Sequence, residues 1–235
     1  MKINCVWEHN GDDSILYADN FVGAFTRGAS LEEAIAKMPE EIRRFQLWRQ
    51  EKALDGCDIV IVQEKESGLQ ISDADSDVLF ASEKEPLSIE EYQYLKSLAL
   101  KSAEDFYALY NSFSDKDKSA APYRKTFYGL VPRTAEEMYQ HTKNVNEYYF
   151  SEIGVKADNE GTIVSCRTRG FATLETIPDF LSLEPVAGSY DEQWSVRKVL
   201  RRFIWHDRIH AKAMYRMGVL TFGAGVIPDI FSFSR

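Results

Sequence analysis

A helical hydrophobic pattern runs through residues 194–217. Apolar residues recur there at intervals of three and four: Val196, Val199, Phe203, Ala213 and Met217. This spacing marks one face of an amphipathic helix. His206 and His210 take two further places in the same stripe, and because they lie four residues apart, their imidazoles project from neighbouring turns. The pattern therefore predicts a long helix that buries two histidines, which is costly unless the ring nitrogens have partners.

The N-terminal part of the chain has the pattern of a small α/β module. Three β-prone segments separated by turn residues are predicted strands: residues 2–9, 15–18 and 21–26. A capping box at residues 30–33 predicts a helix that runs to Trp48, with Pro39 expected to break or restart it. A further strand is predicted at residues 58–63. This order over residues 1–65 predicts a sheet with one face covered by the helix.

Residues 66–86 separate this module from the rest of the chain. They are acidic, contain Gly, Ser and Asp, and are apolar only briefly, at residues 78–80. Such a composition is typical of a linker between domains. We therefore expect a solvated acidic segment here, with one docking strand as an alternative.

From residue 87 the pattern is helical. Capping boxes at residues 88–91 and 134–137 open two helices, and a third is expected within residues 162–177. The histidine-bearing helix is the fourth, and Gly218 is expected to close it. The predicted inward positions of the second helix are Met138, His141, Val145, Tyr148 and Glu152. A third histidine therefore belongs to a predicted core-facing stripe.

A long connection, residues 114–133, joins the first two of these helices. Loops of this length are uncommon unless they have a role such as covering a site. Three aromatic residues are expected to pack it onto the fold: Tyr123, Phe127 and Tyr128.

The predicted fold class is α+β. It consists of a small N-terminal α/β module in residues 1–65, an acidic linker in residues 66–86 and a four-helix bundle with a C-terminal tail in residues 87–235. The tail, residues 219–235, is apolar and rich in Gly, and we expect it to pack along the bundle or against a partner subunit in a homodimer.

Composition and charge narrow the possible partners. The formal net charge of −9 argues against nonspecific binding to nucleic acid or to an anionic membrane surface. Cys5, Cys57 and Cys166 are scattered and form no CxxC pair, which is typical of a reducing cytoplasm. The sequence contains no apolar run long enough to span a bilayer and no signal-peptide pattern at its start, so a cytoplasmic location is expected. The basic residues of the fourth helix are interpreted as a solvated face that balances the acidic linker, with attraction of the carboxylates of an acidic thiol cofactor, or of nucleic acid, as the alternatives.

Three of the four histidines fall on predicted core-facing stripes: His141, His206 and His210. An isolated buried histidine is usually a core residue with a hydrogen-bond partner, and that interpretation remains open here. A pair at i, i+4 with a third histidine from a facing helix could instead supply three nitrogen ligands to a divalent metal and leave one position for water or substrate. Imidazole suits Zn, Ni, Fe or Cu, so the ligands do not select the metal.

The N-terminal module resembles the HicB-like family. The stretches that carry the resemblance are residues 21–34, 38–42 and 45–48. In antitoxin members such a domain binds a small RNase toxin, but this chain lacks the DNA-binding tail that those proteins usually carry, which argues against that role. The alternative is a fold that packs on its neighbour or mediates dimer contacts.

The C-terminal part resembles the DinB-like superfamily, a family of four-helix bundles with a long crossover connection. Residues 132–141 and 194–210 carry this resemblance within residues 87–217. In that family one histidine of the second helix and an HxxxH pair of the fourth hold a divalent metal. The resemblance therefore implies that His141, His206 and His210 are metal ligands, with Zn, Ni or Fe as the candidate ions.

The DinB-like resemblance implies metal-dependent chemistry on a small-molecule substrate. The leading hypothesis is an S-transferase that uses a low-molecular-weight thiol, and a metal-dependent hydrolase would use the same three ligands. A non-enzymatic, metal-stabilised bundle with a HicB-like protein-interaction module is the competing hypothesis. A site open to solvent would favour catalysis, whereas a sealed site would favour a structural role.

Three other residues near the histidines are candidates for chemistry. Glu137 is interpreted as the capping-box carboxylate, with a general base or an acceptor for a ring N–H as the alternatives. Asp207 is expected to point away from the histidines and to pair with a nearby Arg. Tyr148 is interpreted as a packing residue, although it could also donate to a bound oxyanion.

Overall fold

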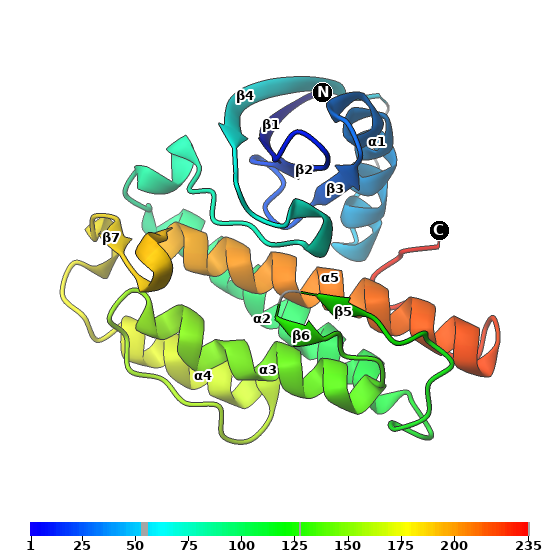
Figure 1. Cartoon of the computed structure of the whole chain (residues 1–235). Coiled ribbons are helices and arrows are strands. Elements are labelled where there is room, and N and C mark those ends of the chain that lie inside the picture. Colours follow the sequence, from blue (N-terminus) through cyan, green and yellow to red (C-terminus); the bar gives the residue numbers. More distant parts are fainter. Residues whose placement is uncertain (53–55, 127, 235) are drawn as a thin grey trace.

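The computed structural model describes residues 1–52, 56–126 and 128–234, and its fold is mixed α+β (Figure 1). Four strands form the N-terminal sheet: β1 (Lys2–His9), β2 (Ser14–Ala18), β3 (Phe25–Gly28) and β4 (Asp58–Glu66). Their order is β3-β2-β1-β4, with β4 parallel to β1 and the other pairs antiparallel. The parallel pairing requires a crossover, which α1 (Leu31–Trp48) supplies.

The predicted strand at residues 21–26 begins only at Phe25. Residues 21–24 form a turn instead, in which the Ala24 N–H donates to the Phe21 carbonyl at 2.9 Å. Gly23 permits this turn because its φ is +105°, a conformation that L side chains rarely adopt. The turn brings the backbone against α5 (Val196–Phe222), where a Cβ on Gly23 would lie 2.3 Å from Ile204 Cγ2.

The start of α1 agrees with the prediction, since the Ser30 hydroxyl accepts a hydrogen bond from the Glu33 N–H at 3.3 Å. The expected break at Pro39 is wrong, because α1 continues through it to Trp48. A proline inside a helix costs about 3 kcal/mol. Met38 and Ile42 on either side are buried in the core beneath the sheet, and this packing holds the helix together across the proline.

Both faces of the sheet are covered, whereas the sequence predicted a cover for only one. α1 packs on the face that carries Ile3, Cys5, Leu16 and Ala18. The other face packs against the following segment and α5, through a cluster made by Val6, Ile15, Tyr17, Phe25, Ile71, Val78, Phe80 and Trp205. In Figure 1 the sheet lies above α5 with α1 at its side, and α1 also contacts α5 directly, since Glu41 Oε1 accepts from Arg208 Nη2 at 2.7 Å.

The segment predicted as a linker, residues 66–86, contains two short 3₁₀ helices, η1 (Ile71–Asp73) and η2 (Ala81–Lys84). The solvated character expected for it does not hold at Ile71, Val78 and Phe80, which are buried. Its apolar residues join the core between the sheet and α5, so the two halves of the chain pack through it.

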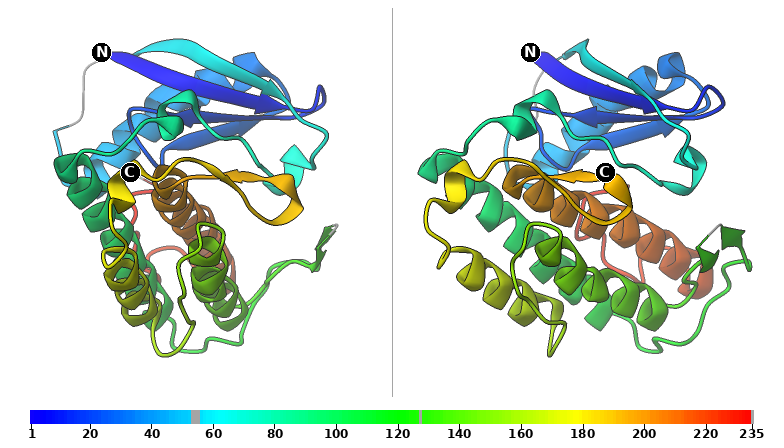
Figure 2. Two further views of the ribbon diagram at one scale, coloured as in Figure 1. Left: turned by 90° about the vertical axis from the view of Figure 1, so that its left-hand side faces the viewer. Right: turned by 60° about the vertical axis from the view of Figure 1, so that its left-hand side comes forward.

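Four helices form the C-terminal half: α2 (Ile89–Asn111), α3 (Ala135–Ser151), α4 (Ile163–Leu174) and α5. All four lie where the sequence predicted helices, and the capping boxes at Ser88 and Thr134 are present. α5 and α4 each pack against both α2 and α3, as the turned views show (Figure 2). Two short hairpins lie in the connections: β5 (Lys125–Thr126) with β6 (Gly129–Leu130), and β7 (Val186–Ala187) with β8 (Gln193–Trp194).

The expected helix end at Gly218 is wrong, because α5 continues to Phe222 and ends at Gly223. Gly218 instead allows the C-terminal tail to approach: a Cβ there would lie 2.8 Å from both Ile227 Cγ1 and Phe113 Cζ. The tail packs onto the fold as predicted. Phe231 is buried and stacks on Trp48 of α1, with ring centroids 5.3 Å apart.

An ion pair lies in the middle of the bundle. Arg167 of α4 and Asp207 of α5 have fully buried side chains and form this pair, as expected for Asp207. Asp207 Oδ2 also accepts from the Ser102 hydroxyl of α2 at 2.5 Å, while Arg167 Nη1 donates to the Ala99 carbonyl at 3.2 Å. The pair therefore ties three helices together.

None of the described helices combines the length and the apolar composition needed to cross a bilayer.

Candidate metal centre

The three predicted histidines meet between two helices. His141 comes from α3, and His206 and His210 come from successive turns of α5. The ring centroids lie 5.2 Å apart for His141 and His206, 4.6 Å for His141 and His210, and 4.4 Å for His206 and His210. One nitrogen of each ring lies within 4.8 Å of the other two. Two nitrogens on one tetrahedral zinc ion would lie roughly 3.3 Å apart, so small rotations of the rings would suffice.

His141 is placed differently from the prediction. The buried residues of α3 are Ala135, Met138, Tyr139, Thr142, Asn146, Tyr149 and Phe150. The buried face is therefore rotated by one residue from the predicted stripe, and Val145 and Tyr148 lie at its border. His141 is exposed towards a cavity, His210 is half-buried and His206 is buried. The three rings thus line a boundary between core and cavity.

Burial keeps these histidines neutral. It is the largest cause of the lowered pKa of His141 and His206, and it lowers the pKa of His210 from 6.5 to about 3, with a further contribution from His141. A neutral imidazole has a lone pair available for a metal. His206 Nδ1 is buried and has no hydrogen-bond partner among the described residues, a costly condition that a metal would relieve. The residues therefore fit a divalent metal.

A cavity of about 1570 Å³ gives access to the histidines. It is larger than the roughly 300–1000 Å³ of typical small-molecule sites. One wall comes from the bundle, and the opposite wall from β3 and α1, including Phe25, Arg27 and Arg44. Both halves of the chain therefore contribute to the site.

The long connection between α2 and α3 borders this cavity, consistent with the expectation that it covers a site. Arg124 and Tyr128 line the cavity, and Arg124 Nη1 lies 3.3 Å from Asp73 Oδ1 of the segment 66–86. Tyr123 and Tyr128 are both largely exposed, contrary to the expectation that they pack onto the fold. Phe127 lies outside the described residues.

Two tyrosines stand beside the histidines. The Tyr149 ring packs edge-on to His206 at 5.9 Å, and both Tyr148 and Tyr149 line the cavity. Burial raises the pKa of Tyr149 to about 12, and it also raises the pKa of Tyr148. Both phenols are therefore neutral hydrogen-bond donors at physiological pH. The oxyanion-donor alternative for Tyr148 is compatible with this placement.

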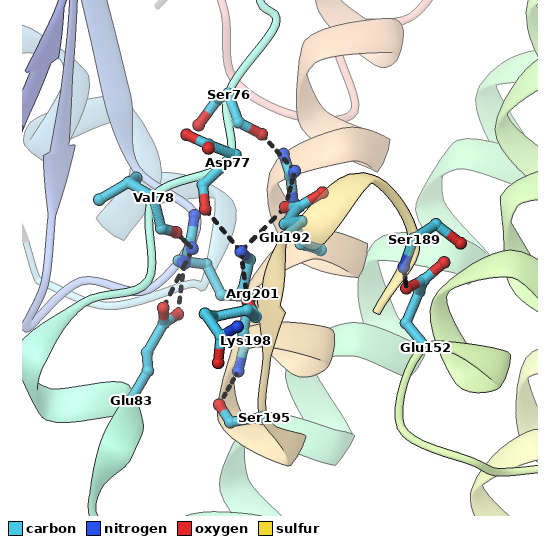
Figure 3. A network of polar contacts seen from close by, with 12 residues as sticks. Ser76, Asp77, Val78, Glu83, Glu152, Ser189, Glu192, Ser195, Lys198 and Arg201 are labelled. Atoms are coloured by element: carbon cyan, nitrogen blue, oxygen red, sulfur yellow. Dashed lines mark hydrogen bonds and ion pairs between the residues drawn. The ribbon is translucent and has the colours of Figure 1, made fainter. Parts of the chain in front are cut away.

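Four basic residues of α5 do not belong to the solvated face that the sequence predicted, because they are buried: Lys198, Arg201, Arg202 and Arg208. Lys198 is buried, and its Nζ donates to the carbonyls of Asp77 at 2.8 Å and Gln193 at 2.7 Å (Figure 3). Arg201 is also buried, and its Nη2 donates to Val78 O at 2.8 Å and to Glu83 Oε2 at 3.1 Å. These side chains satisfy backbone carbonyls of the segment 66–86, which explains why they are drawn into the interior.

Arg202 is a residue of the site that the sequence analysis missed. It lines the cavity one helical turn before His206, and its Nη2 donates to Glu192 Oε1 at 2.7 Å and to the Ser76 carbonyl. Glu192 also pairs with Lys198 at 2.8 Å. These contacts fix the turn of α5 that carries His206. The i, i+4 spacing from Arg202 to His206 was the available signal.

The two carboxylates nearest in sequence to the histidines, Glu137 and Asp207, form hydrogen bonds and ion pairs outside the site. Glu137 Oε2 accepts from the N–H groups of Thr134 at 3.1 Å and Arg133 at 2.7 Å, which confirms its capping role. Asp207 is held by Arg167 in the bundle core.

Comparisons of the chain with protein-family models, curated proteins and solved structures find no match. Its fold and site define an α+β protein with a candidate three-histidine metal centre in a cavity between two halves.

Proposed function

We propose that this chain binds one divalent metal ion through His141, His206 and His210. The main support for this proposal is that three neutral imidazoles lie together at the wall of a cavity. One of them, His206, has a buried ring nitrogen with no hydrogen-bond partner among the described residues. Zn, Ni and Fe remain the candidate ions, because imidazole suits each of them. The four helices and the sheet-and-helix module are compatible with the DinB-like and HicB-like resemblances, which are part of the proposal.

We further propose that the chain is a metal-dependent enzyme acting on a small molecule. A three-histidine set that faces a cavity is typical of catalytic sites, whereas structural sites are closed by four protein ligands. When bound, a divalent ion lowers the pKa of a thiol or a water molecule that it holds. In this chain, Tyr149 can donate a hydrogen bond to a substrate beside His206, and Arg202 fixes the helix turn behind that histidine. Transfer of a low-molecular-weight thiol is the leading reaction and hydrolysis the alternative.

Metal content tests the ligand set. We expect purified protein loaded with Zn, Ni or Fe and then dialysed to retain about one ion per chain, because three nitrogens share it. His206→Ala should retain less than about a tenth of that amount. His9→Ala is the matched control, because His9 lies in β1, stacked on Trp7, outside the site. Unchanged stoichiometry in His206→Ala by elemental analysis would overturn the proposal.

A cobalt-substituted protein distinguishes an enzyme from a structural metal centre. If a ligand from solution can reach the ion, glutathione or 2-mercaptoethanol should add a sulfur-to-cobalt charge-transfer band in the near ultraviolet. Tyr149→Phe should keep the band, since that ring is not among the three ligands. A cobalt spectrum that no thiol changes would favour the metal-stabilised bundle with a protein-interaction module.

A further inference from the structure

A second group of charged residues lies along the same cavity. α5 forms part of the cavity wall from Arg202 to Arg216, a distance of about 21 Å along the helix axis. Lys212 and Arg216 lie four residues apart in the C-terminal part of this wall, and Arg44 of α1 lines the cavity with them. These cationic side chains therefore come from both halves of the chain.

The carboxylates in this part of the cavity are already shared. Glu41 Oε1 accepts from Arg208 Nη2 at 2.7 Å, which leaves its Oε2 at 3.9 Å from Lys212 Nζ. Glu40 is contacted by Arg43 at 2.7 Å and by Arg44 at 2.9 Å. Each carboxylate thus faces two cations, and among the described residues neither forms an ion pair with Arg216.

Arg216 is the least neutralised member of the group. It is exposed towards the cavity, and no hydrogen bond or ion pair of its guanidinium is found in the described part of the chain. Arg44, Arg208 and Arg216 all lie close enough to Lys212 to repel its charge. Half-buried Lys212 therefore lies among like charges with one distant carboxylate, an arrangement that an added anion would stabilise.

We propose that Lys212, Arg216 and Arg44 bind the carboxylate or phosphate group of a small-molecule ligand. Guanidinium groups offer paired N–H donors that match both oxyanions, and a lysine adds a mobile point charge. The concave, enclosed setting suits a small molecule, and the net charge of −9 disfavours a nucleic acid as the source of the phosphate.

The position of this anion site defines the length of the ligand. Along α5 the separation between a histidine and a cation runs from about 3 Å, for His210 and Lys212, to about 15 Å, for His206 and Arg216, with a mean of about 9 Å. A substrate anchored by its anionic end would place a group about that far away beside the three rings. The placement of the substrate beside the three rings rests on the proposed function, whereas the binding of an anion by Lys212, Arg216 and Arg44 does not.

The test uses metal-free protein, so that it does not depend on the histidine site. Inorganic phosphate and succinate are titrated separately at constant ionic strength, adjusted with KCl to remove general screening effects. Binding is followed by calorimetry. Arg216→Gln and Lys212→Met are the test variants, and Arg197→Gln is the matched control, since Arg197 is on the same helix, has the same charge and does not line the cavity. The Arg216 side chain is exposed and forms no hydrogen bond or ion pair with the described residues, so its replacement should leave the fold intact.

We expect saturable binding of at least one anion to the wild-type protein and to Arg197→Gln. The dissociation constant should rise about tenfold in Arg216→Gln and in Lys212→Met, the loss that follows from one charged hydrogen bond. The anion that binds identifies the group. Absence of saturable binding to both anions, or equal affinity in Arg216→Gln and wild type, overturns the proposal. Loss of metal binding in His206→Ala would leave this result unchanged, so the two proposals fail separately.

Discussion

The buried ion pair between Arg167 and Asp207 makes a sharp prediction about stability. Replacing Asp207 by Leu leaves the Arg167 guanidinium in the bundle core with the Ala99 carbonyl at 3.2 Å and the Phe203 ring at 4.1 Å. Breaking a buried pair by removing one partner typically costs about 3–5 kcal/mol. The remaining carbonyl and ring contacts place the expected cost near the lower end, about 3 kcal/mol.

Replacing both Arg167 and Asp207 by apolar residues should lower the unfolding free energy much less than replacing Asp207 alone. Burial raises the pKa of Asp207 despite the lowering effect of Arg167 and Ser102, so the cost of burying the carboxylate exceeds the attraction of its partners. An apolar replacement of both residues therefore forfeits little net stabilisation. We expect Arg167→Met with Asp207→Leu to be less destabilising than Asp207→Leu alone, with a coupling free energy of about 2–3 kcal/mol between the two sites.

Urea unfolding of the metal-free protein, followed by far-UV circular dichroism, measures these differences. With a slope of about 2–3 kcal/mol per molar urea, a loss of 3 kcal/mol lowers the midpoint by roughly 1–1.5 M. Equal slopes among the variants are required for the comparison. If the double variant loses the sum of the two single losses, the side chains act independently and the argument for a coupled buried pair is refuted.

Two further predictions concern the histidines and the joint between the halves. Burial lowers the pKa of His206 and His210, so in the metal-free protein these two histidines bind fewer protons in the folded state than in the unfolded state between about pH 4 and 6.5. Their contribution to the unfolding free energy should therefore rise with pH in this range and level off above 6.5. His210→Gln should make the slope of unfolding free energy against pH smaller than in the wild type by about 1.4 kcal/mol per pH unit, as measured by urea unfolding at several pH values. Gly23→Ala should lower the urea midpoint of unfolding, because a side chain is strained at this positive φ and the new Cβ would meet Ile204. Gly11→Ala is the control, since Gly11 also has a positive φ but lies in open space. A midpoint that Gly23→Ala leaves unchanged would contradict the close packing.

Local signals in the sequence predicted most of the fold. The side chains of Ser88 and Thr134 cap α2 and α3 as expected, because capping depends on residues within one helical turn. The errors at Pro39 and Gly218 have one cause. Each residue usually disrupts a helix, and in each case contacts with distant parts of the chain outweigh that preference.

The three histidines were predictable from helical periodicity, whereas the rest of the site was not. His206 and His210 lie on one face because of their spacing, and both were placed correctly. Their contact with His141 is also found, although His141 faces the cavity and not the core. The wall formed by β3 and α1 left no sequence signal, because it depends on how distant segments pack. Lys198 and Arg201 were misjudged because charged side chains are rarely buried without partners, and their partners, backbone carbonyls and the carboxylates of Glu83 and Glu192, come from other segments of the chain.

The joint through residues 76–83 has a consequence for anyone who wishes to produce the two halves separately. A cut after residue 86 would strip Lys198 and Arg201 of the carbonyls of Asp77 and Val78, and of the Glu83 carboxylate. The severed bundle would then expose an apolar flank around Trp205 beside Arg201, which would have lost these partners, while the severed sheet would expose the surface around Tyr17 that packs on Trp205. Each fragment would tend to self-associate. The end of the segment 66–86, although the sequence marks it as a domain boundary, is therefore a poor place to separate the two halves.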